Sequence, residues 1–182
     1  MKRNIRNTPE PGSHTEPREN PKMFLEAGDT ITIGSRKHRI ERVSLAKDLG
    51  EKFGLVIPDD VPIYWLQRAG ERRKGAYVPE QNIVLFFDNT DEETQHHELT
   101  HAVEYHQKPT SELLALYERV KAAITEDSFE GFVSFNFMKN IHEFIADGRT
   151  KGVFIHALKK EGLHDDFVRE TAYLFTDPTK DS

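Results

Sequence analysis

The stretch IVLFFDNTDEETQHHELTHAVEYH, residues 83–106, decides which fold we expect. It opens with five consecutive apolar residues, Ile83 to Phe87, and such a run predicts a buried strand. Thr90 and Glu93 then have the spacing of a capping box, so a helix should begin there and continue to about His106. We therefore predict a strand that leads directly into a helix.

Residues 97–101 of this expected helix read His-Glu-Leu-Thr-His. Side chains four residues apart on a helix project from one face, so we expect His97 and His101 to bind a single zinc ion. Glu98 lies beside them and is the expected general base, which takes a proton from water that the metal has made more acidic and later delivers it to the leaving amine. The motif therefore indicates metal-dependent hydrolysis of an amide bond.

The other side of the same helix is expected to pack on the core. The residues that cluster there on a helical wheel are Leu99, Ala102, Val103 and His106. We expect His106, and also His96 at the edge of this side, to be packing residues rather than metal ligands, because a lone histidine in such a place is usually structural.

The third metal ligand must come from another element. A catalytic zinc ion usually has three protein ligands and keeps one position for water, and Glu104 lies too far along the helix to complete the set. Glu143 is the first choice, because it lies in a later expected helix in which Asp147 follows on the same face. The alternatives are His142 as the main rival, and then Glu130 and Glu126.

A His-Glu-x-x-His motif followed on a later helix by Glu-x-x-x-Asp resembles the gluzincins, the thermolysin-like metallopeptidases of the zincin type. The resemblance rests on the two helices and the hairpin before them. It implies that Glu143 is the third zinc ligand and that Asp147 accepts a hydrogen bond from His97, which fixes the orientation of that ring. The compact helical half is more similar to the anthrax lethal factor-like catalytic domains, which often carry a glycine where this chain has Thr100.

The segments around the motif predict an α+β, zincin-like fold: a small twisted, mostly antiparallel sheet followed by a helical half. Before the motif we expect a hairpin over residues 30–43, a helix over 45–53, a strand at 62–66 and a second hairpin over 74–87 with its turn at 79–82. After the motif we expect only helices, at about 110–125, 137–150 and 164–175.

Zincins resemble one another in having an edge strand before the zinc-binding helix, on which the substrate lies as an added strand. The resemblance gives this role to residues 83–87 or to their partner 74–78. Amide hydrolysis also needs a hydrogen-bond donor for the oxyanion of its tetrahedral intermediate. The sequence offers several donors without choosing among them: Tyr77, Tyr105, His142, His164 and Tyr173.

Composition narrows the class of protein and its partners. The length of 182 residues favours one domain, residues 23–182, after a proline-rich tail over residues 1–22 that we expect to be flexible. No cysteine is present, so any metal must be held by His, Asp or Glu. The net charge of -6 argues against a nucleic-acid partner. No stretch is apolar enough for a membrane span, and the missing signal-peptide pattern favours the cytoplasm, with non-classical export left open.

The leading hypothesis is a zinc-dependent peptidase, an endopeptidase rather than an exopeptidase, that acts on a peptide or protein. One catalytic Zn²⁺ is held by His97, His101 and Glu143, and Glu98 is the base. The second hypothesis is a catalytically inactive module of the same fold, regulatory or toxin-like, that recognises a partner. The third is an accidental motif in a metal-free helical protein. The substrate and the oligomeric state stay open.

Overall fold

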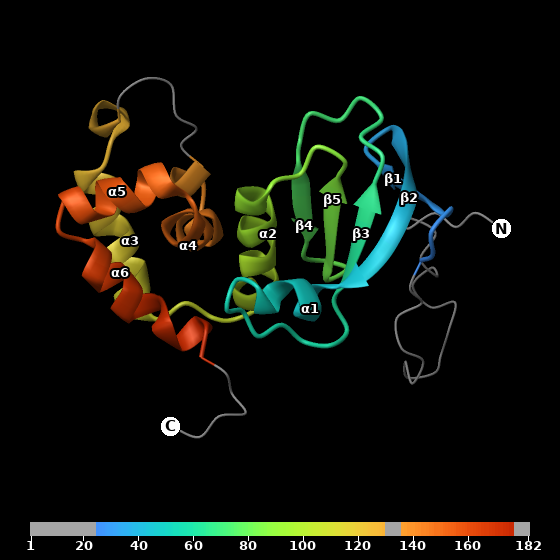
Figure 1. The fold of residues 1–182 in the computed structure, drawn as a ribbon. Helices are drawn as coiled ribbons and strands as arrows, with labels where there is room; N and C mark the ends of the chain where they lie inside the picture. Colours follow the sequence, from blue (N-terminus) through green and yellow to red (C-terminus); the bar gives the residue numbers. More distant parts are fainter. Residues whose placement is uncertain (1–24, 130–135, 177–182) are drawn as a thin grey trace, which may run out of the picture.

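The computed structural model of the protein describes residues 25–129 and 136–176. Five strands form one sheet in the order β1-β2-β3-β5-β4, and a group of helices lies beside it (Figure 1). Neighbouring strands are antiparallel except for β3 and β5, which are parallel. The predicted α+β class and the mostly antiparallel sheet are confirmed. The predicted tail, residues 1–22, lies outside the described residues.

Both predicted hairpins are present in the sheet. The first joins β1 (Thr30–Ile33) to β2 (Arg36–Leu45), and β2 then pairs with β3 (Pro62–Leu66). A register shift between Ile40 and Arg42 separates the two halves of β2, and such irregularities bend a strand. The second hairpin joins β4 (Gly75–Val78) to β5 (Ile83–Phe87).

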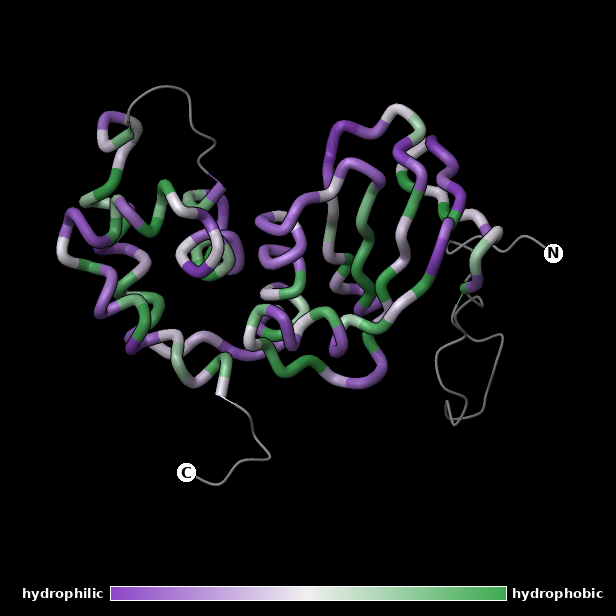
Figure 2. Tube along the Cα trace, in the orientation of Figure 1, coloured by the Kyte–Doolittle hydropathy of each residue, from purple (hydrophilic) through white to green (hydrophobic). Residues whose placement is uncertain are grey.

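Both faces of the sheet are covered. On one face, Val84 and Phe86 pack with Leu99 of α2 (Glu92–Glu104) and with residues around α1 (Ala46–Glu51). On the other face, Leu85 and Ile31 belong to a second cluster. Successive side chains of a strand point to opposite faces, so a strand covered on both sides must be apolar throughout. Figure 2 accordingly shows β5 as a hydrophobic segment.

The helical half contains one helix more than predicted. Its helices are α3 (Ser111–Ala123), α4 (Ile141–Thr150), α5 (Gly152–Lys160) and α6 (His164–Thr171). Short 3-10 turns accompany them: η1 (Glu126–Ser128), η2 (Asn136–Met138) and η3 (Ala172–Leu174). The unpredicted helix is α5, which is separated from α4 by Lys151 alone, too short a break to show as a loop in the sequence. None of the described helices is long and apolar enough to cross a bilayer.

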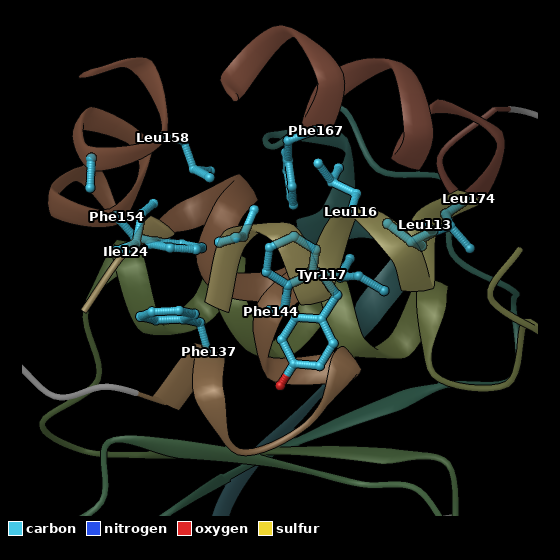
Figure 3. Packing of buried hydrophobic residues seen from close by; sticks show 13 residues of the cluster. Leu113, Leu116, Tyr117, Ile124, Phe137, Phe144, Phe154, Leu158, Phe167 and Leu174 are labelled. Atoms are coloured by element: carbon cyan, nitrogen blue, oxygen red, sulfur yellow. The ribbon is translucent and has the colours of Figure 1, made fainter. Parts of the chain in front are cut away.

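These helices share an aromatic core of their own (Figure 3). Phe144 of α4 meets Phe167 of α6 edge-on, with ring centroids 5.3 Å apart. Phe154 of α5 also contacts Phe144. Gly148 permits this packing, because a Cβ there would lie 2.3 Å from the Phe167 ring. The close approach fixes the position of α4, the helix that carries Glu143.

Helix α2 lies between the sheet and the helical half (Figure 1). It ends at Glu104, two residues before the predicted end, and the prediction that His106 packs on the core is wrong, because His106 is exposed. His96 packs as predicted: its ring stacks on Phe53 with centroids 4.7 Å apart.

The predicted capping box is also wrong. Asp91 is the N-cap of α2, and its Oδ1 accepts a hydrogen bond from the backbone N–H of Thr94 at 2.8 Å. The Thr90 hydroxyl is buried with no hydrogen-bond partner among the described residues. Hydrogen bonds from Lys74 and from Thr94 lower the pKa of Asp91 to about 2.

Replacement of Asp91 by Ala should therefore lower the free energy of unfolding by about 1 kcal/mol, the usual effect of removing an N-cap. Thr90→Ala, which removes no hydrogen bond of the described residues, should change it by much less. Urea denaturation of both variants measures the difference. An equal loss in the two variants would contradict the assignment of Asp91 as the cap.

Candidate metal centre and cleft

Three side chains converge where α2 and α4 meet. His97 and His101 project from α2, and Glu143 projects from the first turn of α4. Asn140 caps that turn by accepting a hydrogen bond from the Glu143 N–H at 2.9 Å, which fixes where the helix begins. One ligand atom of each of the three side chains lies within 4.8 Å of the other two.

The separations between these atoms are compatible with three ligands of one metal ion. The Nε2 atoms of His97 and His101 are 3.2 Å apart, and Glu143 places one oxygen 2.9 Å from His101 and the other 3.4 Å from His97. A tetrahedral zinc ion with bonds of about 2.0–2.1 Å holds its ligand atoms about 3.3 Å apart. Among the described residues this is the one group of three His, Asp or Glu side chains close enough to share an ion.

Asp147 orients the first imidazole. It lies one turn after Glu143 on α4, is buried, and places Oδ1 3.2 Å from Nδ1 of His97. This is the contact that the gluzincin resemblance implies. The Nδ1–H of His97 donates to this carboxylate, so once the ring is neutral the lone pair of Nε2 faces the cluster, as a metal ligand requires.

Glu104 orients the second imidazole. Its side chain is 1% exposed, and Oε1 lies 3.0 Å from Nδ1 of His101. The same carboxylate reaches across to α4, where Oε2 lies 2.9 Å from Nδ1 of His142. The sequence disfavours Glu104 as a ligand because of its distance along the helix, and its separation of three residues from His101 is the signal for this supporting role.

His142, the rival third ligand, does not belong to the cluster. Its Nδ1 faces Glu104, and its ring stacks on Tyr105 with centroids 4.1 Å apart. Glu143, the next residue, is the one whose carboxylate points at the imidazoles. Of the weaker alternatives, Glu130 and the side chain of Glu126 lie outside the described residues.

In the metal-free protein, the two imidazoles of this cluster hold protons more tightly than usual. Burial opposes charge on both imidazoles, but hydrogen bonds to Asp147 and Glu143 raise the pKa of His97 above its usual value. Hydrogen bonds to Glu104 and Glu143 raise the pKa of His101 in the same way. A metal ion competes with these protons, because it binds the neutral imidazole.

Glu98 lies beside the cluster and borders a cleft. Burial raises the pKa of its carboxyl above the usual range, while the neighbouring imidazoles and a hydrogen bond from the backbone N–H of Tyr77 act in the opposite direction. A carboxylate whose pKa is raised above its usual value is a better general base than an ordinary exposed one.

The cleft has a volume of about 260 Å³ and opens between β4, α2 and the start of α4. Its lining combines the catalytic candidates with the strand that faces them: Arg73, Gly75, Ala76, Tyr77, Pro79, Glu98, His101, Tyr105, Asn140, His142 and Glu143. Three of the five oxyanion donors that the sequence offered are in this lining, namely Tyr77, Tyr105 and His142. His164 and Tyr173 are not among the lining residues.

Strand β4 borders the cleft and is an edge of the sheet, whereas β5 lies between β3 and β4. The Phe87 N–H donates to the Lys74 carbonyl, so by the alternation of an antiparallel ladder the backbone polar groups of Gly75 and Tyr77 point away from β5. Gly75 allows β4 to lie close to α2, because a Cβ there would be 3.0 Å from Thr94 Cγ2.

Comparison of the chain with protein-family models, with curated proteins and with solved structures finds no match. Function is therefore inferred from the chemistry and geometry of the cluster and the cleft.

The two buried carboxylates should support metal binding. Asp147→Asn and Glu104→Gln each remove the charge that orients one imidazole, and each should weaken zinc binding roughly 10-fold to 100-fold. Asp165→Asn, at an exposed position of α6, is the control and should bind zinc like the wild type. Competition with a fluorescent chelator measures the affinities. Unchanged binding in both site variants would show that these carboxylates do not support the metal.

Zinc binding should also release protons at neutral pH, because the raised pKa values of His97 and His101 keep protons in the metal-free cluster. The apparent affinity should rise with pH between about pH 6 and pH 8, by about tenfold per pH unit for each proton displaced. Titration calorimetry in buffers of different ionisation enthalpy counts these protons. Binding without proton release would show that the two imidazoles are already neutral in the metal-free protein.

Proposed function

We propose that this protein is a zinc-dependent peptidase of the gluzincin type, in which His97, His101 and Glu143 hold one catalytic Zn²⁺. The observation that carries the proposal is the convergence of these three side chains at ligand distances, with Glu98 beside them at the cleft. The open edge of β4 along the same cleft supports a peptide as the substrate, because an extended peptide can pair with it as an added strand.

When bound, zinc makes water more acidic and polarises the substrate carbonyl. Residues of the chain position the substrate, transfer the proton and stabilise the oxyanion. Backbone groups of Gly75 and the backbone carbonyl of Tyr77 hold the peptide extended beside the metal ligands. A carboxylate oxygen of Glu98 accepts a proton from the attacking water and passes it to the leaving amine nitrogen as the C–N bond breaks. Tyr105 and His142 are near enough to the cleft to donate a hydrogen bond to the oxyanion.

The ligand set is tested by metal analysis of the purified protein. The wild type should contain about one zinc per chain, and His97→Ala and Glu143→Ala should lose it. His96→Ala is a matched control, because His96 is the adjacent imidazole but stacks on Phe53 outside the cluster. It should keep its zinc.

The mechanism is tested by Glu98→Gln, which keeps the shape of the side chain but cannot take up a proton. This variant should retain zinc and lose hydrolysis of a peptide library by a factor of about 100 or more. Glu93→Gln, an exposed position on the same helix, should remain as active as the wild type. Full activity of Glu98→Gln would refute the proposed base. Zinc binding without any hydrolysis by the wild type would favour the inactive binding module instead.

A further inference from the structure

Arg73 is the one Lys or Arg among the residues that line the cleft. It lies two residues before β4, at the end of the edge on which the proposed substrate would lie. Glu98 lines the same cleft. The hydrogen bond to Glu71 raises the pKa of the Arg73 guanidinium, and the charge of Glu98 adds a smaller increase. The cleft therefore has a positive charge near the proposed base and the proposed substrate strand.

Glu71 holds this guanidinium in a fixed position. Arg73 Nε donates to Oε1 of Glu71 at 2.9 Å, and a second nitrogen, Nη2, donates to Oε2 at 3.1 Å. Glu71 is itself fixed, because its Oε1 also accepts the backbone N–H groups of Arg72 and Arg73, and its side chain is only 13% exposed. The arginine is thus oriented in advance, which lowers the entropic cost of a further contact.

The contacts with Glu71 leave most of the guanidinium donors unused. A guanidinium carries five N–H donors, and Glu71 takes two of them, one on Nε and one on Nη2, which leaves three on Nη1 and Nη2. Apart from these two contacts with Glu71, the Arg73 guanidinium forms no hydrogen bond with the described residues. The remaining donors form a fork that matches the two oxygens of a carboxylate.

We propose that Arg73 gives the cleft a preference for peptides that carry a carboxylate close to the scissile bond. This inference rests on the proposed peptidase function and names its substrate class. Two sources present the same chemistry: the side chain of Asp or Glu within a peptide, or the free carboxylate at a peptide's C-terminus. Arg72 does not line the cleft, so the preference belongs to Arg73 alone.

The test measures binding rather than turnover. Zinc-loaded Glu98→Gln is immobilised and offered random peptides in two libraries, one with an amidated and one with a free C-terminus. Selected sequences are then made as pairs that differ by Glu against Gln, or by free against amidated ends. Arg73→Gln is compared with Arg72→Gln as the matched control, and an Arg73→Gln, Glu71→Gln double variant excludes an effect of a stranded Glu71 carboxylate.

Peptides with the carboxylate should bind roughly 10-fold more tightly than their neutral partners, as for a charge-assisted hydrogen bond at a partly exposed site. The preference should disappear in both Arg73 variants and persist in Arg72→Gln. Enrichment of Asp or Glu in the amidated library identifies a side-chain carboxylate. Capture of peptides from the library with free C-termini alone identifies a C-terminal carboxylate. Equal binding of the paired peptides, or a preference that survives without Arg73, would overturn the inference.

Failure of this inference and failure of the proposed function give different results. If the wild type hydrolyses library peptides without any carboxylate preference, the peptidase proposal stands and the role of Arg73 is refuted. If the wild type hydrolyses nothing while Glu98→Gln still selects acidic peptides through Arg73, the cleft is a carboxylate-binding site in a protein that is not a peptidase.

Discussion

Helix α2 is buried between two layers, and the polar side chains that it carries into the interior must find partners there. An unpaired buried polar group costs about 1–3 kcal/mol. The helix that packs on the side of α2 away from the sheet therefore has to supply the partners. Helix α4 does so: Asp147 pairs with His97, and Glu143 with both imidazoles. Glu104 completes the set from α2 itself and also joins His142 on α4. This network fixes how the helical half sits against the sheet half.

The same network would orient the cluster for the proposed metal. Each imidazole has a carboxylate at Nδ1, which leaves both Nε2 atoms facing each other and facing Glu143. Such an arrangement of acceptors is favourable only when protons or a cation lie between them. Structural stability and the proposed chemistry therefore depend on the same contacts, and a substitution in the network affects both.

The sheet contributes the strand that faces this cluster. Because β5 is paired on both sides, the unpaired edge falls to β4, and Gly75 lets that edge lie against the start of α2. The backbone N–H of Tyr77 thereby reaches Glu98, and Arg73 is placed in the lining of the cleft. The proposed base, substrate strand and specificity residue are thus brought together by packing between β4 and α2.

The sequence by itself determined the class of fold, both hairpins, helix α2 and the candidates His97, Glu98 and His101, because local periodicity and a four-residue spacing on a helix carry that information. It also indicated Glu143 and Asp147, through their spacing on a later helix and through a resemblance, while His142 stayed open as a ligand. Tertiary structure alone decided that Glu143 rather than His142 faces the imidazoles, that β4 is the edge, and that Glu104 and Arg73 belong to the site. Apart from Glu104, whose spacing of three residues from His101 is a local signal, those features depend on contacts between separate elements, α2, α4 and β4, so no local pattern encodes them.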